Sequence, residues 1–445
     1  MDFVRDPIPR LLLKMAAPAS TGFFFNTMYN VVDTYWGGQL STETLAALSL
    51  SFPVFFIIVA TGAGISAGTT ALIANSLGGG EESKALKYHA QAITFGIVAT
   101  LVMAILLFGS LSPIFKLFKP TADLLTVAMN YMRIIVGGAI FMVLNNILNA
   151  ALTARGDTKT YRNFLILGFL LNIALDPLLM FGFSINGQVL IPEMREQGIA
   201  LATVLIQAVG VAYLTWRVVR SGTFPKLDKE NFKPDAGYFK EISIQSFPPV
   251  MNFVTVALGT FVINFFIAKY GTEAVAGYGA GIRIEQIALV PTIGLNTALT
   301  AMAGQNNGAG RLDRVWKSYT YSLLFGLIIM LVIYTPILFF ARQLVGLFTA
   351  DQKVLTIGLA YLYIQAITFY SYILLFQCNS VMQGIKQPGM IFWVGLYRQI
   401  AAPALVFALF SFLWGVNGVW WGLVLVNWSA ALFMAWFVWK SFKSL

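Results

Sequence analysis

Long runs of hydrophobic residues separated by short polar segments dominate this 445-residue chain. Each run reaches about 20 residues, the length that an α-helix needs to cross the hydrocarbon core of a bilayer. The runs lie at 11–36, 45–76, 89–112, 124–153, 162–183, 198–219, 241–268, 274–306, 316–340, 353–383, 388–412 and 417–439. No polar segment between them is long enough for a soluble domain. The pattern therefore predicts an all-α polytopic membrane protein with twelve transmembrane helices.

The composition supports this class. Hydrophobic residues make up 58% of the chain and charged residues only 11%, whereas ordinary soluble domains carry about 25% charged residues. The single cysteine, Cys378, excludes an internal disulfide, and the single histidine, His89, leaves no His/Cys metal cluster. We therefore expect no cofactor and no metal centre. The first residues lack the features of a cleavable signal peptide, so we expect the first helix to stay in the mature protein.

The net charge of +10 is explained by topology. With the N-terminus inside, 20 of the 29 Lys and Arg residues fall in cytoplasmic segments, six in external segments and three within helices. This excess predicts that both termini are cytoplasmic. The basic residues then need no nucleic-acid partner to explain them.

An internal repeat organises the chain. Residues 42–47, TETLAA, match residues 272–277, TEAVAG, at an offset of 230. The same offset aligns Gly64 with Gly294, Gly78 with Gly308, Tyr131 with Tyr361 and Asn149 with Asn379. With six helices in each half, the repeats are parallel, and we expect two pseudo-symmetric six-helix bundles with a substrate cavity between them. The predicted parts are an N-lobe at 1–220 (helices 1–6), a cytoplasmic linker at 221–240 and a C-lobe at 241–445 (helices 7–12).

Two carboxylates interrupt the predicted helices of the first half. Asp33 lies in helix 1 and Asp176 in helix 5, both towards the expected external ends. The repeat positions in the second half hold Ile263 and Val406, so neither acid is needed to build the fold. Because an ionisable group inside a bilayer is costly, it is by default a functional-site hypothesis. We predict that the two acids bind a proton and titrate jointly.

Polar residues on neighbouring helices extend this site. Asn172 precedes Asp176 by one helical turn and shares its face. The predicted cation- or proton-coupling cluster consists of Asp33, Tyr131, Asn149, Asn172, Asp176 and Thr203. Its members could instead make ordinary interhelical hydrogen bonds. Because oxygen ligands suit hard cations, Na⁺ bound by Asp33, Asn172, Asp176 and Thr203 stays open as an alternative to the proton.

Four further residues are candidates for supporting roles. Pro18 interrupts helix 1 before Asp33, removes a backbone hydrogen bond and offers a conformational hinge or a static kink. Arg283 and Glu285 lie two positions apart in helix 8, so they project to different faces and need partners on other helices. They give the C-lobe a possible role of its own. Arg398 is expected to snorkel or to cap carbonyl groups.

Catalysis is not predicted. An intramembrane hydrolase would need a nucleophile beside a base, and His89 lies at a cytoplasmic helix end with no nucleophile next to it. The two aspartates lack the supporting motifs of an aspartyl protease. A passive channel remains open, and dependence of transport on an ion gradient would exclude it.

The residues resemble a known family. The segments YNVVDTYWGGQLSTETLAALSLSFP, ARGDTKT (154–160) and LNIALDPLLMFG (171–182), set in two six-helix halves, resemble the multidrug and toxic compound extrusion (MATE) transporters of the MOP fold, and most closely the DinF-like branch. The resemblance covers essentially the whole chain and implies an N-lobe site at the six residues of the predicted cluster, with a bend of helix 1 near Pro18. NorM-type proteins instead have acids in helices 7 and 10, where this chain has VMNFVT (250–255) and YILLFQCNS (372–380).

The expected function is therefore secondary active multidrug efflux by H⁺-coupled antiport, with drugs, dyes and other organic cations as substrates. The alternatives are a Na⁺-coupled multidrug antiporter and a lipid-linked-saccharide flippase of the same superfamily. We expect a monomer surrounded by lipid in a bacterial or archaeal cell (inner) membrane.

Overall fold

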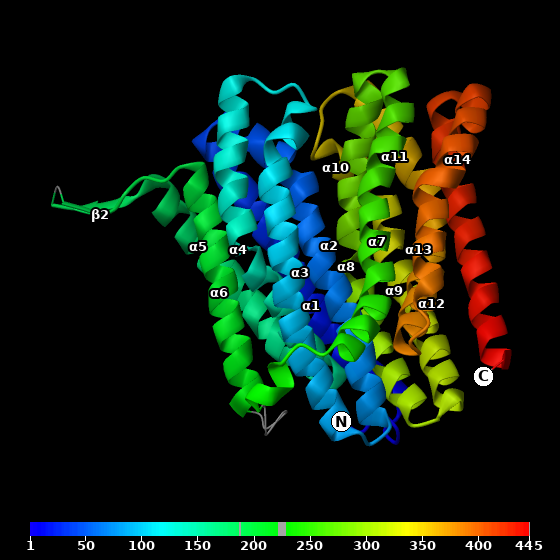
Figure 1. Cartoon of the computed structure of the whole chain (residues 1–445). Coiled ribbons are helices and arrows are strands. Elements are labelled where there is room, and N and C mark those ends of the chain that lie inside the picture. The colour runs from blue at the N-terminus through cyan, green and yellow to red at the C-terminus, as the bar shows by residue number, and fades with distance from the viewer. Residues whose placement is uncertain (187, 221–227, 445) are drawn as a thin grey trace. The chain divides into compact units, whose positions relative to one another are not determined.

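The computed structural model describes residues 1–186, 188–220 and 228–444. Its long helices follow the predicted hydrophobic runs and confirm the all-α architecture (Figure 1). They are α1 (Ile8–Leu40), α2 (Thr42–Gly78), α3 (Glu82–Lys116), α4 (Ala122–Ala154), α5 (Lys159–Phe181), α6 (Glu196–Arg220), α7 (Ala236–Ile267), α8 (Thr272–Gly308), α9 (Leu312–Phe339), α11 (Gln352–Gln365), α12 (Thr368–Gly384), α13 (Gly389–Leu396) and α14 (Ala402–Ser444). Short elements are η1 (Lys229–Phe232), η2 (Ala268–Tyr270), α10 (Ala341–Gly346) and the π-helix η3 (Tyr397–Ala401).

Within the described residues, nine helices are long and apolar enough to cross a membrane, and the bent pair α11 and α12 makes a tenth span. The helix α1 is not among them and carries Arg10, Lys14 and Asp33. One of the nine spans extends from Gly389 to Lys443 and contains two of the helices predicted from the sequence. Non-helical backbone at Trp414 and at Gly415, whose φ is 60°, separates the two. The part of the chain that the structure describes thus contains twelve long helices, as predicted.

The break between α11 and α12 was not predicted, because no Gly or Pro lies at residues 366–367. The two helices are bent by 51° at this point. The indole of Trp428 donates to the carbonyl of Ile367 at 3.2 Å, and the hydroxyl of Tyr334 donates to that of Leu362 at 2.7 Å. Side chains of other helices therefore satisfy backbone groups next to the bend, as a membrane interior requires.

The described chain packs as two compact units whose boundaries lie inside helices. One unit contains Met1–Ser20, Ala74–Gly80 and Met251–Leu445, and the other contains Thr21–Ile73 and Glu81–Val250. The first part of α1 therefore packs with the second half of the chain, and the first part of α7 with the first half. Of the predicted linker 221–240, residues 221–227 lie outside the described residues.

The two exchanged helix ends are related by the internal repeat. A Cβ atom on Gly64 of α2 would lie 2.7 Å from the backbone nitrogen of Val250 on α7. A Cβ atom on Gly294 of α8 would lie 2.8 Å from the backbone nitrogen of Ser20 on α1. The offset of 230 aligns Gly64 with Gly294 and Ser20 with Val250. The duplicated sequence thus forms the same close helix crossing twice.

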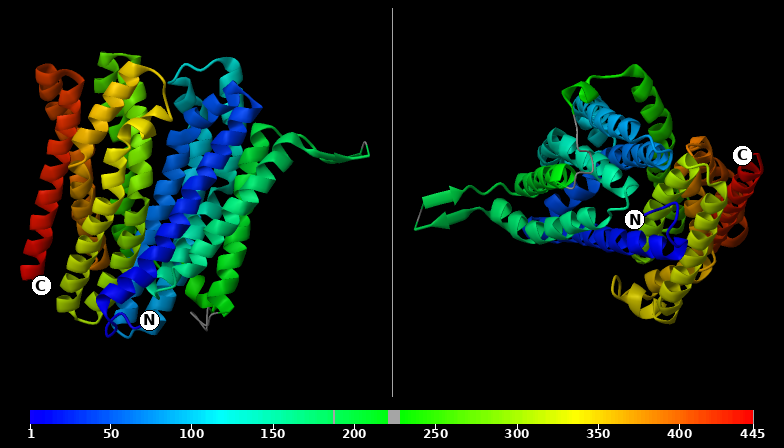
Figure 2. Two further views of the ribbon diagram at one scale, coloured as in Figure 1. Left: turned by 180° about the vertical axis from the view of Figure 1, so that it is seen from behind. Right: turned by 90° about the horizontal axis from the view of Figure 1, so that it is seen from below.

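In the unit of the first half, α4 packs against α3 and α6, and α6 packs against α5 (Figure 1). Small and apolar side chains form its core; Ile135, Val136 and Ala139 of α4 are among the most deeply buried. The antiparallel strands β1 (Phe183–Ile185) and β2 (Gln188–Ile191) pair Ser184 with Val189 and extend away from the ends of α5 and α6 (Figure 2). Exposed except at Ile191, which is half-buried, they were not predicted from the hydrophobic pattern.

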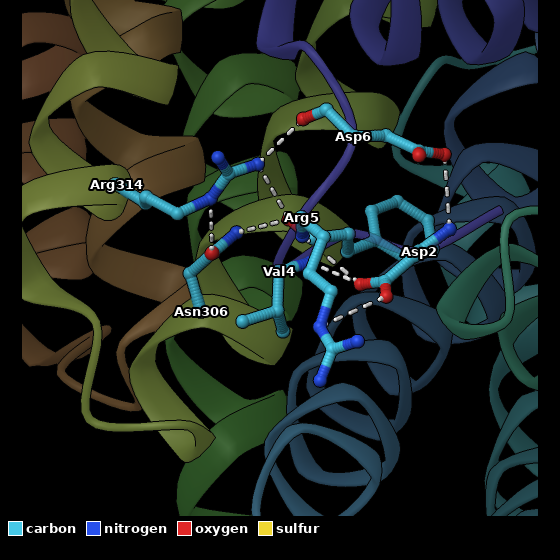
Figure 3. Close-up of polar contacts among 7 residues, drawn as sticks. Asp2, Val4, Arg5, Asp6, Asn306 and Arg314 are labelled. Atoms are coloured by element: carbon cyan, nitrogen blue, oxygen red, sulfur yellow. Dashed lines mark hydrogen bonds and ion pairs between the residues drawn. The ribbon is translucent and has the colours of Figure 1, made fainter.

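In the other unit, the N-terminal segment binds the turn between α8 and α9 (Figure 3). Arg314 donates to the carbonyl groups of Phe3 at 3.0 Å and of Asp6 at 2.7 Å. Asn306 donates to the carbonyl of Phe3 at 3.2 Å, while the side chain of Phe3 is buried. These contacts hold the base of α1 on α8 and α9.

Candidate functional site

A hydrogen bond joins α1 and α5 at the predicted site. The Nδ2 atom of Asn172 donates to the Oδ1 atom of Asp33 at 2.8 Å. Asn172 is fully buried and Asp33 is half-buried. The segments around both residues are mostly apolar, so the polar pair meets among few other hydrogen-bond donors.

Asp176 lies one turn further along α5, is completely buried, and interacts with both Asp33 and Asn172. Neither of its carboxylate oxygens has hydrogen-bond geometry to a group in the described part of the chain. Desolvation makes an ionised carboxylate costly unless a donor, a cation or a proton compensates it. A proton or a small cation at these oxygen atoms would compensate the charge.

Tyr131 and Thr203 complete the group on α4 and α6. Both are buried, and Tyr131 is within electrostatic reach of Asp33 and Asp176. A residue that sequence reasoning missed, Tyr29 of α1, interacts with Thr203 and lies near the two acids and Tyr131. Its position four residues before Asp33, on the same helical face, was a signal that could have found it.

Asn149 is not brought into this group. It lies 18 positions after Tyr131 on α4, about 27 Å further along the helix axis. Its Oδ1 atom instead accepts a hydrogen bond from Thr153 at 3.2 Å. Five of the six residues predicted from the sequence therefore lie together, and Asn149 does not. The family pattern gives the helix on which each residue lies but not its position along that helix.

Pro18 lies inside α1, which continues unbroken through it from Ile8 to Leu40. Two residues later, the hydroxyl of Ser20 donates to the carbonyl of Pro291 on α8 at 2.9 Å. The proline stands close to the boundary at Ser20, where α1 passes from one compact unit to the other. Its role as a hinge stays a prediction.

Arg283 and Glu285 of α8 have separate surroundings. Arg283 is exposed, and its guanidinium lies 5.8 Å from the ring centre of Phe348. Glu285 is buried and accepts a hydrogen bond from the hydroxyl of Tyr361 on α11. Tyr361 aligns with Tyr131 in the internal repeat. In each half of the chain, this tyrosine therefore lies near an acidic residue on a long helix.

Comparison with known proteins agrees with the fold. The MatE family model matches residues 18–178 and 248–413. The chain is 29% identical over 426 residues to the FAD transporter of Shewanella oneidensis, covering 95% of this chain and 92% of that protein. It is 26% identical over 434 residues to the probable multidrug resistance protein NorM of Thermotoga maritima, covering 94% and 90%.

A solved structure has the same fold. It is the outward-facing conformation of a multidrug resistance MATE family transporter of the MOP superfamily, with a TM-score of 0.91 at 24% identity over 99% of this chain and 97% of that one. The family match includes Asp33 and Asp176 and continues through most of the second half. This multi-pass membrane protein therefore belongs to the MatE family, the MATE transporters.

Proposed function

We propose that this transporter is a secondary active exporter of amphipathic, often cationic organic compounds, driven by proton entry. Relatives such as NorM of Thermotoga maritima, a probable multidrug resistance protein, support the substrate class. The observation that carries the proposal is the meeting of Asp33, Asn172 and Asp176 in the first half of the chain. The excess of basic residues on one side supports cytoplasmic termini, and the proposed location is the (inner) membrane of a bacterial or archaeal cell.

The proposed cycle has two states. A proton bound by the Asp33 and Asp176 pair removes negative charge and weakens the charge-assisted bond from Asn172. The helix α1 then bends near Pro18, where a backbone hydrogen bond is missing, and the bound compound is displaced outward. Release of the proton to the cytoplasm resets the site. Each proton contributes about 2.3 kcal/mol per 100 mV of membrane potential.

Sodium is the second candidate for the coupling ion. The Oδ1 atom of Asn172, both carboxylate oxygens of Asp176 and the Oγ1 atom of Thr203 are buried without a hydrogen-bond partner in the described residues. Together with Asp33 they offer the oxygen ligands that a hard cation takes. The same residues would therefore bind Na⁺ where the proposed cycle has a proton.

The substrate could also be anionic. The relative from Shewanella oneidensis, which matches 95% of this chain, is named an FAD transporter, and FAD carries two phosphates. Export of such a compound would use the same ion-coupling site with a different binding surface.

Dye efflux from proteoliposomes tests the proposed function. Ethidium-loaded vesicles receive an imposed pH gradient or an imposed Na⁺ gradient, with the wild type, Asp33→Asn and the exposed control Asp123→Asn compared. Efflux that follows the pH gradient, is lost in Asp33→Asn and is kept in Asp123→Asn is expected. Efflux that follows only Na⁺ selects the second ion, and efflux that follows neither gradient refutes antiport. Transport of lipid-linked saccharides without ethidium efflux selects the flippase.

A further inference from the structure

The second half of the chain has a polar cluster of its own within the membrane-spanning helices. It consists of Glu285 on α8, Tyr361 on α11, Tyr372 on α12, Arg398 on η3 and Asn427 on α14. All five residues belong to one compact unit. The proposed ion-coupling cycle uses none of them.

The carboxylate of Glu285 is surrounded by hydroxyl groups. Tyr361 donates a hydrogen bond to it, and Tyr372 interacts with it. Tyr278 on its own helix and Tyr334 on α9 lie within electrostatic reach. Hydrogen bonds from neutral donors therefore already stabilise this negative charge.

Arg398 is left with unused hydrogen-bonding capacity. Its Nη1 atom donates to the Oδ1 atom of Asn427 at 2.9 Å, and its guanidinium lies 5.7 Å from the ring centre of Tyr372. The Nε atom is buried without an acceptor, and no acid lies within ion-pair distance of the guanidinium, among the residues that the structure describes. Glu285 acts on it only at longer range. Its acceptor is a side-chain amide and not the backbone carbonyl expected for capping, and snorkelling stays a prediction.

This environment suits an anionic group. A guanidinium presents five N–H donors in a planar fork that matches carboxylate and phosphate oxygens, and a buried donor without an acceptor is costly. Arg398 is half-buried, so it is not sealed inside the bundle. It also lies in a π-helix, an irregular turn that is frequent at functional sites.

An aromatic surface adjoins the guanidinium. Tyr372 and Phe376, one turn apart on α12, have ring centres 5.9 Å apart and planes inclined by only 9°. Both side chains are half-buried. A flat ring system attached to the anionic group would find an apolar, planar surface here.

We propose that Arg398 binds the phosphate or carboxylate group of an aromatic organic anion, with the rings of Tyr372 and Phe376 contacting its ring system. The inference deepens the proposed export function, on which it rests, by assigning a binding site to the anionic class of substrate. Glu285 then acts as a positioning residue that keeps the guanidinium and the two tyrosines in place.

A pair of ligands that differ by one phosphate tests this site. Binding of flavin mononucleotide and of riboflavin to the purified full chain is measured by flavin fluorescence anisotropy, in a neutral detergent without anionic lipid. The variants are Arg398→Gln, Arg398→Lys and Arg342→Gln, a control at an exposed arginine of α10 in the same unit. The wild type and the control should bind the mononucleotide at least about tenfold more tightly than riboflavin, as a charge-assisted hydrogen bond implies.

In Arg398→Gln the two flavins should bind equally, with riboflavin unchanged from the wild type. Arg398→Lys keeps the charge, so it should retain part of the preference, and it serves if the glutamine variant does not fold. Equal binding of both flavins to the wild type, or an unchanged preference in Arg398→Gln, overturns the proposal. So does binding of phosphatidylglycerol without the mononucleotide, which would assign Arg398 to a lipid headgroup. Ethidium efflux of the same preparations reports separately on the export function.

Discussion

The Nδ2 atom of Asn172 on α5 donates to the Oδ1 atom of Asp33 on α1 at 2.8 Å, across 139 positions of sequence. This bond fixes the height of α1 against α5 and brings Asp33 beside Asp176. Any change in the charge of the acids therefore acts directly on the contact between the two helices.

Replacement Asn172→Ala should destabilise the protein and uncouple transport. Loss of the donor removes a hydrogen bond to the half-buried carboxylate of Asp33, at a cost of about 1–3 kcal/mol. Thermal unfolding in detergent should shift to a temperature several degrees lower, and dye efflux driven by a pH gradient should fall. Asn163→Ala, an exposed change on the same helix, is the control. Unfolding and efflux equal to the wild type would show that the bond is not important.

A close crossing of α2 and α8 gives a second prediction. A Cβ atom on Gly78 would lie 1.9 Å from the carbonyl oxygen of Gln305, and one on Gly308 would lie 1.9 Å from that of Asn75. Gly78→Ala should therefore force the helices apart and cost about 1–3 kcal/mol of unfolding free energy. In the control Gly137→Ala, where nothing lies within 4 Å, stability should stay equal or rise, because alanine favours the helix. Equal stability of the two variants would contradict the close approach of α2 and α8 at Gly78.

A third prediction concerns the segment that leads into α7. The Nζ atom of Lys87 lies 3.0 Å from the Oδ2 atom of Asp235, and this bond holds the pKa of Asp235 below its usual range. Backbone N–H groups of Tyr238 and Gly237 lower that pKa further. Because the folded pKa is lowered, the stabilisation is present above the unfolded value of about 3.9 and is lost as the pH falls below it.

Thermal unfolding of the wild type and Asp235→Asn at several pH values measures this effect. The wild type should unfold at the higher temperature by a constant margin from neutral pH to about pH 5, and the margin should shrink below about pH 4. Glu230→Gln, which alters a mostly exposed pair with Lys233, should leave the wild-type curve unchanged. A margin that grows on acidification would contradict the assigned sign.

Much of the fold could be predicted because membrane helices reveal themselves by length and hydropathy. The repeat aligned Gly64 with Gly294, and in the structure these glycines meet equivalent residues of α7 and α1. The exchange of helix ends between the two compact units could not be predicted, because it depends on which helix each glycine faces. The bend between α11 and α12 likewise rests on side chains from distant helices.

The site was predictable where neighbours share a helix. Asn172 and Asp176 lie one turn apart, and the same rule would have found Tyr29 from Asp33. Asn149 does not join the cluster. Its distance of 18 positions from Tyr131 on the same helix already argues against a shared site. The contact between Arg398 and Asn427 joins two spans that sequence spacing does not relate.

Substrate-driven proton movement tests the central claim most directly. Proteoliposomes with the pH dye pyranine inside are given an outward ethidium gradient and no ion gradient, for the wild type, Asp176→Asn and the exposed control Asp123→Asn. The wild type and the control should acidify the lumen as ethidium leaves, and Asp176→Asn should not. Ethidium efflux by the wild type without acidification, or equal acidification by Asp176→Asn, would contradict proton coupling at the Asp33 and Asp176 pair.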